Sequence, residues 1–200
     1  MKPNTNQRLS ILVKTAVLAA LAFIIFLLPI SIPIFPGFLT FDFSEIPAIF
    51  AALAYGPVSA IAVELVKNLL HLFMSTTAGV GEFANFLVGC FFVVPLGLIY
   101  KRYKNRKGAF IGLGVSTISM VVLASLANYF LILKLYELIA GYPLQAVIGM
   151  SQAANSGITD KFSLILYAFV PFNLLKGLVI SLITIVIYKR LSPLLHKNLF

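Results

Sequence analysis

The sequence predicts an all-α integral membrane protein whose six transmembrane helices form one bundle. Of its 200 residues, 60% are hydrophobic and only 10% are charged, whereas about 25% of residues are charged in soluble domains. The mean hydropathy is +1.03, and apolar runs recur at close to the roughly 20 residues that a bilayer-spanning helix needs. No polar stretch is long enough for a separate soluble domain, so we expect a single membrane-embedded domain over residues 1–200.

Apolar runs that meet or approach the length of a membrane span cover residues 10–30, 58–74, 83–100, 108–133 and 163–188. A further run, 43–54, is only about half the usual length, so we predict a short second helix that is tilted or covered by loops. Tyr55, Gly56 and Pro57 then predict a tight turn. The first run follows basic residues, as in a secretory signal. It is longer than a signal core and lacks a small-x-small cleavage pattern, so we expect it to be retained.

Basic residues indicate the inner side of the membrane. If the chain has six spans and starts inside, 11 of its 15 lysine and arginine residues fall in inner segments. These residues are Lys2, Arg8, Lys14, Lys101, Arg102, Lys104, Arg106, Lys107, Lys189, Arg190 and Lys197. Such an excess is typical of cytoplasmic segments, so both termini are predicted to be cytoplasmic and the protein to lie in the cell membrane. The net charge of +9 is then an orientation signal, and we expect no nucleic-acid binding.

Two segments on the predicted outer side are unusual. Residues 31–42 carry Pro33, Pro36 and Gly37 among aromatic residues, which makes this segment too stiff and too apolar for a solvated linker. Residues 134–162 form a long segment, and loops of this length are usually mobile or functional. Together the two segments could cover an outward-facing pocket, or they could simply pack on the outer end of the bundle.

Polar side chains in the last and fifth spans predict a small-molecule site. Asn173 and Lys176 are three residues apart and share a helix face. Polar groups that face hydrocarbon are costly, so this pair should face a protein interior or a cavity. Counted along their helices, Asn128 and Asn173 reach a similar level in the outer half. Amides and an ammonium suit a ligand with several hydroxyl or carbonyl groups, but the three residues could also merely bond to neighbouring helices.

The span over 58–74 carries four polar residues on one helix face, at the i, i+3, i+4, i+7 spacing. They are Glu64, Lys67, Asn68 and His71. Glu64 could satisfy Lys67 or Asn68, which would make the face a structural brace, and for Glu64 and His71 this interpretation is favoured. No metal site is expected, because the sequence has only two histidines. Asn85 opens the next span and is a further candidate.

Small residues on the first span, Ala16 and Ala20, lie four apart and form a flat strip for close helix packing. From the residues alone, packing within the protein is favoured over a partner interface. The chain lacks the usual signatures of hydrolases, metalloproteases and phosphate-binding loops. We therefore predict a protein that is not an enzyme and has no catalytic residue.

Several motifs, in this order and spacing, resemble a known family over nearly the whole chain. They occupy residues 39–47, 55–58, 66–69, 83–87, 128–130 and 171–177. The chain is similar to the substrate-binding S components of energy-coupling factor (ECF) vitamin transporters, and most of all to the riboflavin-specific members. Residues 141–161 match no motif of the family, and neither does Glu64.

The resemblance implies six spans with a short second helix and capture of riboflavin from outside the cell. It implies that Asn128, Asn173 and Lys176 bond the ribityl hydroxyls, while the ring lies among the first outer loop and neighbouring helices. The full set of expected substrate-binding residues is Asn128, Asn173, Lys176, Thr40, Asp42, Lys67, Asn68 and Asn85. The resemblance also implies that Ala16 and Ala20 dock on a transmembrane coupling subunit, which two ATPase subunits energise. Riboflavin would be the transported ligand, and no cofactor is expected.

Three alternatives remain open. The chain could be an S component for another vitamin, such as folate, pantothenate or thiamine. It could be a facilitator that works without ATPases. A membrane enzyme acting on lipid or isoprenoid substrates is disfavoured, because it would need clustered acids or a histidine pair near the inner surface.

Overall fold

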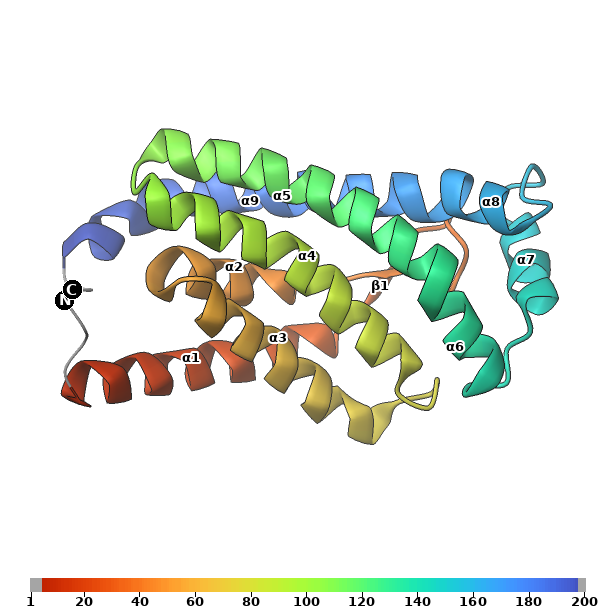
Figure 1. Ribbon diagram of the computed structural model, residues 1–200, viewed down its shortest axis with the longest axis horizontal. Coiled ribbons are helices and arrows are strands. Elements are labelled where there is room, and N and C mark those ends of the chain that lie inside the picture. Colours follow the sequence, from red (N-terminus) through yellow and green to blue (C-terminus); the bar gives the residue numbers. More distant parts are fainter. Residues whose placement is uncertain (1–4, 198–200) are drawn as a thin grey trace.

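The computed structural model describes residues 5–197, which form an elongated bundle of helices (Figure 1). The long helices are α1 (Thr5–Phe26), α3 (Pro57–His71), α4 (Val80–Arg102), α5 (Arg106–Ala127) and α9 (Val170–Lys197). Five helical stretches of the described chain are long and apolar enough to cross a membrane. They cover Thr5–Phe26, Pro57–Met74, Val80–Arg102, Arg106–Leu138 and Lys161–Tyr188. The prediction of a mostly helical protein with several membrane-spanning helices is confirmed.

The predicted short second helix is α2, Glu45–Tyr55. With 11 residues it is about 16 Å long, half the thickness of a bilayer core. Gly56 ends it at a φ of 93°, and the Gly56 N–H donates to the carbonyls of Ala51 and Ala52. Pro57 then opens α3 at a position where its missing N–H costs nothing. The three residues predicted as a tight turn thus form the corner between two helices.

The boundaries of the first helix differ from the prediction. The helix covers 5–26 instead of 10–30. It begins earlier because the polar residues that precede the apolar run are compatible with a helix, and hydropathy does not mark a helix start. It ends earlier because the chain turns ahead of Pro29, which disfavours helical conformation in the residue before it.

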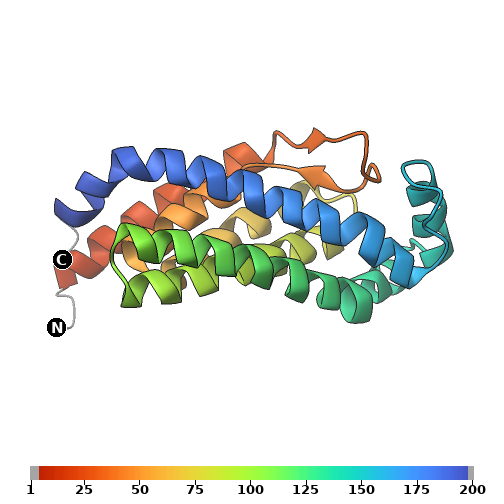
Figure 2. The same cartoon turned by 90° about the horizontal axis from the view of Figure 1, so that it is seen from above.

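The two segments that were predicted to lie on the outer side are more ordered than loops. In the first, β1 (Ile30–Ser31) pairs antiparallel with β2 (Thr40–Phe41), and Figure 2 shows this ribbon alongside α9. In the second, a π-helical turn, η2 (Asn128–Ile132), continues α5 into α6 (Leu133–Leu138). Two short helices follow, α7 (Leu144–Gln152) and α8 (Lys161–Leu164). A π-helical turn, η3 (Ile165–Phe169), joins α8 to α9.

The core has two parts. The larger part surrounds α2, whose Ala48, Ile49 and Ala51 are completely buried, so this short helix is enclosed by the long ones. The smaller part lies at the end of the bundle away from the start of α1, where Val147 of α7 packs with Ile158 and Leu164. Burial of these side chains holds the segment 134–162 against the bundle.

Close packing at the corner between α2 and α3 depends on Gly97 of α4. A Cβ atom at this position would lie 2.9 Å from the backbone nitrogen of Pro57, and backbone atoms cannot move aside cheaply. We expect Gly97→Ala to destabilise the protein by about 1–3 kcal/mol through overpacking, seen as a lower thermal unfolding midpoint in detergent.

The matched control is Gly114→Ala on α5, where an added Cβ meets no atom within 4 Å. Because alanine has the higher helix propensity, this variant should be as stable as the parent or more so. Equal destabilisation by both substitutions would contradict the packing argument.

Candidate ligand-binding site

A cavity of about 510 Å³ lies in the half of the bundle away from the start of α1. It falls in the size range of small-molecule sites. Five of the predicted substrate-binding residues line it: Thr40, Asn85, Asn128, Asn173 and Lys176. The helical segments α4, η2 and α9 supply four of them, and β2 supplies Thr40. The convergence of Asn128 and Asn173 that helix counting predicted is therefore present.

Asn128 and Asn173 are held in the same way. Each side-chain amide donates through Nδ2 to the carbonyl four residues earlier in its own helix, at 2.8 Å to Ala124 and 2.9 Å to Phe169. Both residues are buried, and both lie in or next to a π-helical turn, a feature that is frequent at functional sites. Since the amide nitrogen is anchored, the carbonyl oxygen of each remains as an acceptor for a ligand.

Lys176 is fixed by two carboxylates. Its Nζ lies 3.0 Å from Asp42 Oδ2 and 2.9 Å from Glu45 Oε1. An ammonium has three N–H donors, so one donor remains after these two contacts. Lys176 also lines the cavity, and the structure thus presents one anchored cation to a ligand.

Asp42, in the loop that leads into α2, stays ionised in this setting. Burial raises the pKa of its carboxyl, but the ammonium groups of Lys176 and Lys67 and the hydrogen bond from Ser44 more than offset that effect and hold the pKa at about 2. The ion pair with Lys176 therefore persists throughout the physiological pH range.

A second buried lysine, Lys67, lies close to the cavity but does not line it. Lys67 Nζ contacts Ser44 Oγ at 2.7 Å, Glu45 Oε1 at 3.4 Å and Glu64 Oε2 at 2.9 Å, and neither Lys67 nor Glu64 has any exposed surface. Asn68 donates to the backbone carbonyl of Glu64 at 2.9 Å. The brace that the sequence suggested for this helix face is thus present.

Three of the predicted substrate-binding residues, Asp42, Lys67 and Asn68, do not line the cavity. Charge compensation explains the two charged residues, because a buried lysine needs buried carboxylates: Asp42 pairs with Lys176, and Lys67 pairs with Glu45 and Glu64. Asn68 is instead bonded to the backbone of Glu64.

Glu82 and His71 form the polar part of another cavity wall. Glu82, in the first turn of α4, accepts hydrogen bonds from Ser75 Oγ at 2.8 Å and lies 2.9 Å from His71 Nδ1. The His71 ring packs against the Phe26 ring in a tilted arrangement, with centroids 4.3 Å apart. Aromatic faces in the remaining lining come from Phe38, Tyr136, Tyr142, Phe169 and Phe172.

Glu45 and Glu82 were not predicted as site residues. Glu45 could have been found from the charges of the spans. Lys67 and Lys176 lie within membrane spans and require acidic partners, and the chain has only six acidic residues to supply them. Glu82 could not, because its partners His71 and Ser75 depend on how the turn between α3 and α4 folds.

Ala16 and Ala20 are exposed on α1. A different face of this helix, with Thr15, Ala19 and Ala22, is buried against the bundle. Only 17% of an 18-residue apolar segment of α1 is buried inside the protein. The corresponding share is 39% for the span that contains α5. The strip formed by Ala16 and Ala20 therefore faces away from the protein.

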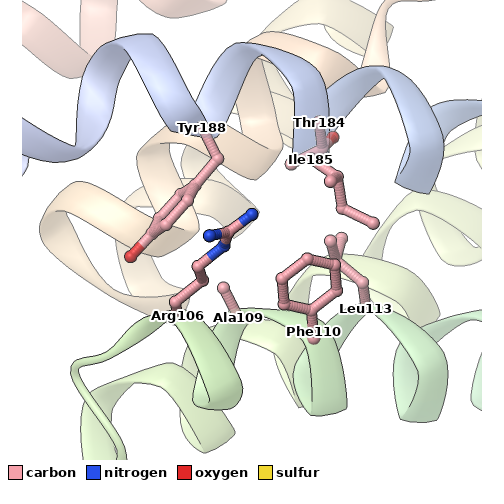
Figure 3. Close-up of a pocket in the computed structure, with 7 residues that line it drawn as sticks. All are labelled: Arg106, Ala109, Phe110, Leu113, Thr184, Ile185 and Tyr188. Carbon is pink, nitrogen blue, oxygen red and sulfur yellow. The ribbon is translucent and has the colours of Figure 1, made fainter.

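A small cavity of about 10 Å³ lies between α5 and α9, near the end of the bundle where α1 begins (Figure 3). Arg106 extends between Tyr188 and Phe110 at this place. The cavity has room for about one water molecule, so it is not a ligand site. In the described part of the chain, no group of three or more metal-binding side chains is placed to hold a metal ion.

Comparison with known proteins gives consistent results. Residues 10–188 match the family model described as "ECF transporter, substrate-specific component". The riboflavin transporter RibU of Staphylococcus aureus (strain TCH60) is 37% identical over 96% of this chain and 94% of its own. The riboflavin transporter FmnP of Bacillus subtilis (strain 168) is 35% identical over 94% of each chain.

A solved structure supports the same relationship at the level of the fold. It is described as the S component of a bacterial ECF transporter and superposes with a TM-score of 0.74 at 36% identity. The match covers 95% of this chain and 99% of the other.

Proposed function

The chain belongs to the family of substrate-specific (S) components of ECF transporters, and from this premise we propose that it captures riboflavin outside the cell for delivery inward. It is a multi-pass protein of the cell membrane and not an enzyme, and riboflavin is its cargo and not a cofactor. The observation that carries the proposal is the cavity of about 510 Å³, in which anchored amides and an ammonium meet aromatic walls. Relatives that are 35% and 37% identical are riboflavin transporters.

The polar groups of the cavity suit the ribityl chain of riboflavin. Asn128 and Asn173 offer carbonyl oxygens that accept from hydroxyl groups, because their amide nitrogens are anchored. Lys176 offers one N–H that donates to a hydroxyl oxygen. Each hydroxyl thereby exchanges water for a fixed protein partner, and such a site rejects analogues that lack the hydroxyls.

The aromatic walls suit the flat isoalloxazine ring, for which Phe38, Tyr136, Phe169 and Phe172 supply apolar faces. Thr40, at the base of the β-ribbon, lies at the edge of the same space. Asp42 and Lys67 act indirectly: Asp42 pairs with Lys176, and Lys67 shares Glu45 with it, so that both help to fix the cation that the ligand meets. Asn68 bonds to the Glu64 backbone and supports the helix that carries Lys67. Tyr142 and Met150 line the cavity from the segment 134–162, which supports a role for this segment as part of its cover.

We further propose that the protein is one domain with six spans, counting α2 as the short second span, and that both termini are cytoplasmic. The described ends of α1 and α9 lie at the same end of the bundle as the basic turn between α4 and α5 (Figure 1), in line with the positive-inside rule. The cavity then opens towards the outside.

The proposed partners are a transmembrane coupling subunit and two ATPase subunits, as the family membership implies. The exposed strip of Ala16 and Ala20 is proposed as the docking surface for the coupling subunit, since small residues allow close approach of another helix.

Purification tests the proposal directly. We expect the protein isolated from flavin-containing cells to be yellow and to release riboflavin, identified by mass spectrometry. A colourless protein that binds folate, pantothenate or thiamine instead would overturn the riboflavin assignment. Riboflavin uptake by vesicles that contain this chain alone would overturn the need for coupling subunits.

A further inference from the structure

A buried charge cluster lies beside the large cavity, where α2, α3 and α9 meet. It consists of three carboxyl groups and two ammonium groups, which belong to Asp42, Glu45, Glu64, Lys67 and Lys176. None of these residues is more than 3% exposed. If all five were charged, one negative charge would be left without compensation inside a membrane protein. Such a charge is costly, and a buried acid avoids the cost by binding a proton.

The contacts of the three carboxyl groups show which of them is least compensated. Asp42 has a donor on each oxygen, a backbone N–H at 2.9 Å and Lys176 Nζ at 3.0 Å. Glu45 Oε1 contacts Lys176 at 2.9 Å and Lys67 at 3.4 Å, although its Oε2 has no partner among the described residues. Glu64 contacts one lysine only, at 2.9 Å through Oε2, and its Oε1 has no hydrogen-bond partner in the described chain. Glu64 is therefore the carboxyl group with the weakest compensation.

The surroundings of Glu64 reinforce this assignment. The charged groups that act on it belong to the cluster itself and are Lys67, Glu45 and Lys176. On the α4 side, a Cβ atom added at Gly89 would collide with the carboxyl group, so the backbone of α4 lies directly against it. The neighbouring thiol of Cys90 also faces Glu64, and a thiol is mostly uncharged at neutral pH. From α1, the Phe26 ring lies over Lys67 Nζ, 5.4 Å from its centroid.

We propose that Glu64 binds a proton in the folded protein, which makes the cluster neutral and leaves Lys67 to Glu45. When the proton leaves at alkaline pH, the new carboxylate competes with Glu45 for Lys67. Glu45 then attracts Lys176 more strongly, and because Lys176 lines the cavity, a ligand there loses part of its contact with the cation. Glu64 is thus a positioning residue that makes ligand binding depend on pH. The effect on riboflavin rests on the proposed function, whereas the bound proton does not.

Infrared spectroscopy detects the proton directly, because a protonated carboxyl group has a carbonyl stretch that a carboxylate lacks. The spectrum is recorded in a maltoside detergent, which has no carbonyl group, at about pH 6, where an ordinary glutamate with a pKa of about 4.3 is ionised. We expect a carboxylic acid band that disappears in Glu64→Gln and decreases in the parent protein as the pH is raised. Glu137→Gln changes an exposed glutamate and should leave the band unchanged.

Thermal unfolding in the same detergent distinguishes a neutral acid from an ion pair. An amide in place of a neutral carboxyl group leaves no charge unpaired, so Glu64→Gln should unfold at the same temperature as the parent protein or higher. The folded parent holds a proton that the unfolded chain has released, so its stability should fall as the pH rises, by up to about tenfold in the folding equilibrium per pH unit. The advantage of Glu64→Gln should therefore grow with pH.

Glu45→Gln is the contrasting variant. It removes the anion that Lys67 and Lys176 share, and a buried ion pair that loses one partner is strongly destabilised. We expect its unfolding midpoint to be lower than that of the parent by roughly 10 °C.

Riboflavin affinity is the third readout. Between about pH 6 and about pH 9 the parent protein should lose roughly three- to tenfold more affinity than Glu64→Gln. Both proteins retain Cys90 and bind the same ligand, so titration of the thiol and of the flavin ring cancels in the comparison.

Three results would overturn the inference: a parent protein without a carboxylic acid band, a band that persists in Glu64→Gln, or a Glu64→Gln variant that is as unstable as Glu45→Gln or does not fold. Equal pH dependence of riboflavin affinity in both proteins would overturn the effect on Lys176. A parent protein that binds no riboflavin would overturn the proposed function, and the infrared and unfolding measurements would still decide whether Glu64 holds the proton.

Discussion

Asn173→Ala is expected to weaken riboflavin binding by about 10- to 100-fold, because it leaves a ligand hydroxyl without its acceptor in a water-poor site. The side chain is 4% exposed, and its oxygen is available because Nδ2 is anchored to Phe169 O. Titration calorimetry on the detergent-solubilised protein measures the change directly.

Thr184→Ala is the control for this substitution. Thr184 is also buried on α9 and donates to the carbonyl four residues earlier, Ile180 O, at 2.8 Å, but it does not line the large cavity. The control removes the same kind of side-chain to backbone bond without a ligand contact, so riboflavin affinity should be kept. Unchanged affinity in a well-folded Asn173→Ala variant would remove Asn173 from the site.

Ala20→Trp is expected to abolish riboflavin uptake while leaving riboflavin binding by the isolated subunit intact, and Ala16→Trp should do the same. Both alanines are exposed on α1, so an indole ring there meets no atom of this protein's core. It does obstruct the close approach of another helix, for which small residues are needed. Uptake is measured in cells that carry the coupling and ATPase subunits, and binding is measured on the purified chain.

Two further variants of α1 locate this effect. Leu21 is the next residue along the helix and points about 100° away; it is exposed, so Leu21→Trp should preserve both uptake and binding. Ala19 is 1% exposed, so Ala19→Trp should destabilise the fold and abolish both. Loss of binding in Ala20→Trp would indicate a role in folding instead of docking.

Much of the site could be predicted because polar groups are rare and costly in a membrane protein. Asn128, Asn173 and Lys176 stand out against apolar surroundings, and the helical rise is enough to bring them to one level. The same reasoning identified Lys67 and Asn68, but it could not tell a group that faces the cavity from one that faces a counter-charge. That choice depends on the direction of each side chain, which Asp42, Glu45 and Glu64 determine jointly.

By itself, the sequence determined the membrane class, the short second helix, the family and the residues among which the site had to be found. These follow from hydropathy, charge asymmetry and local motifs, each of which acts over one helix or less. The tertiary structure alone decided that the segments 31–42 and 134–162 are ordered, and that Lys176 is shared between Asp42 and Glu45. Each of these depends on contacts between helices distant in sequence, and packing selects those contacts only when the whole bundle has formed.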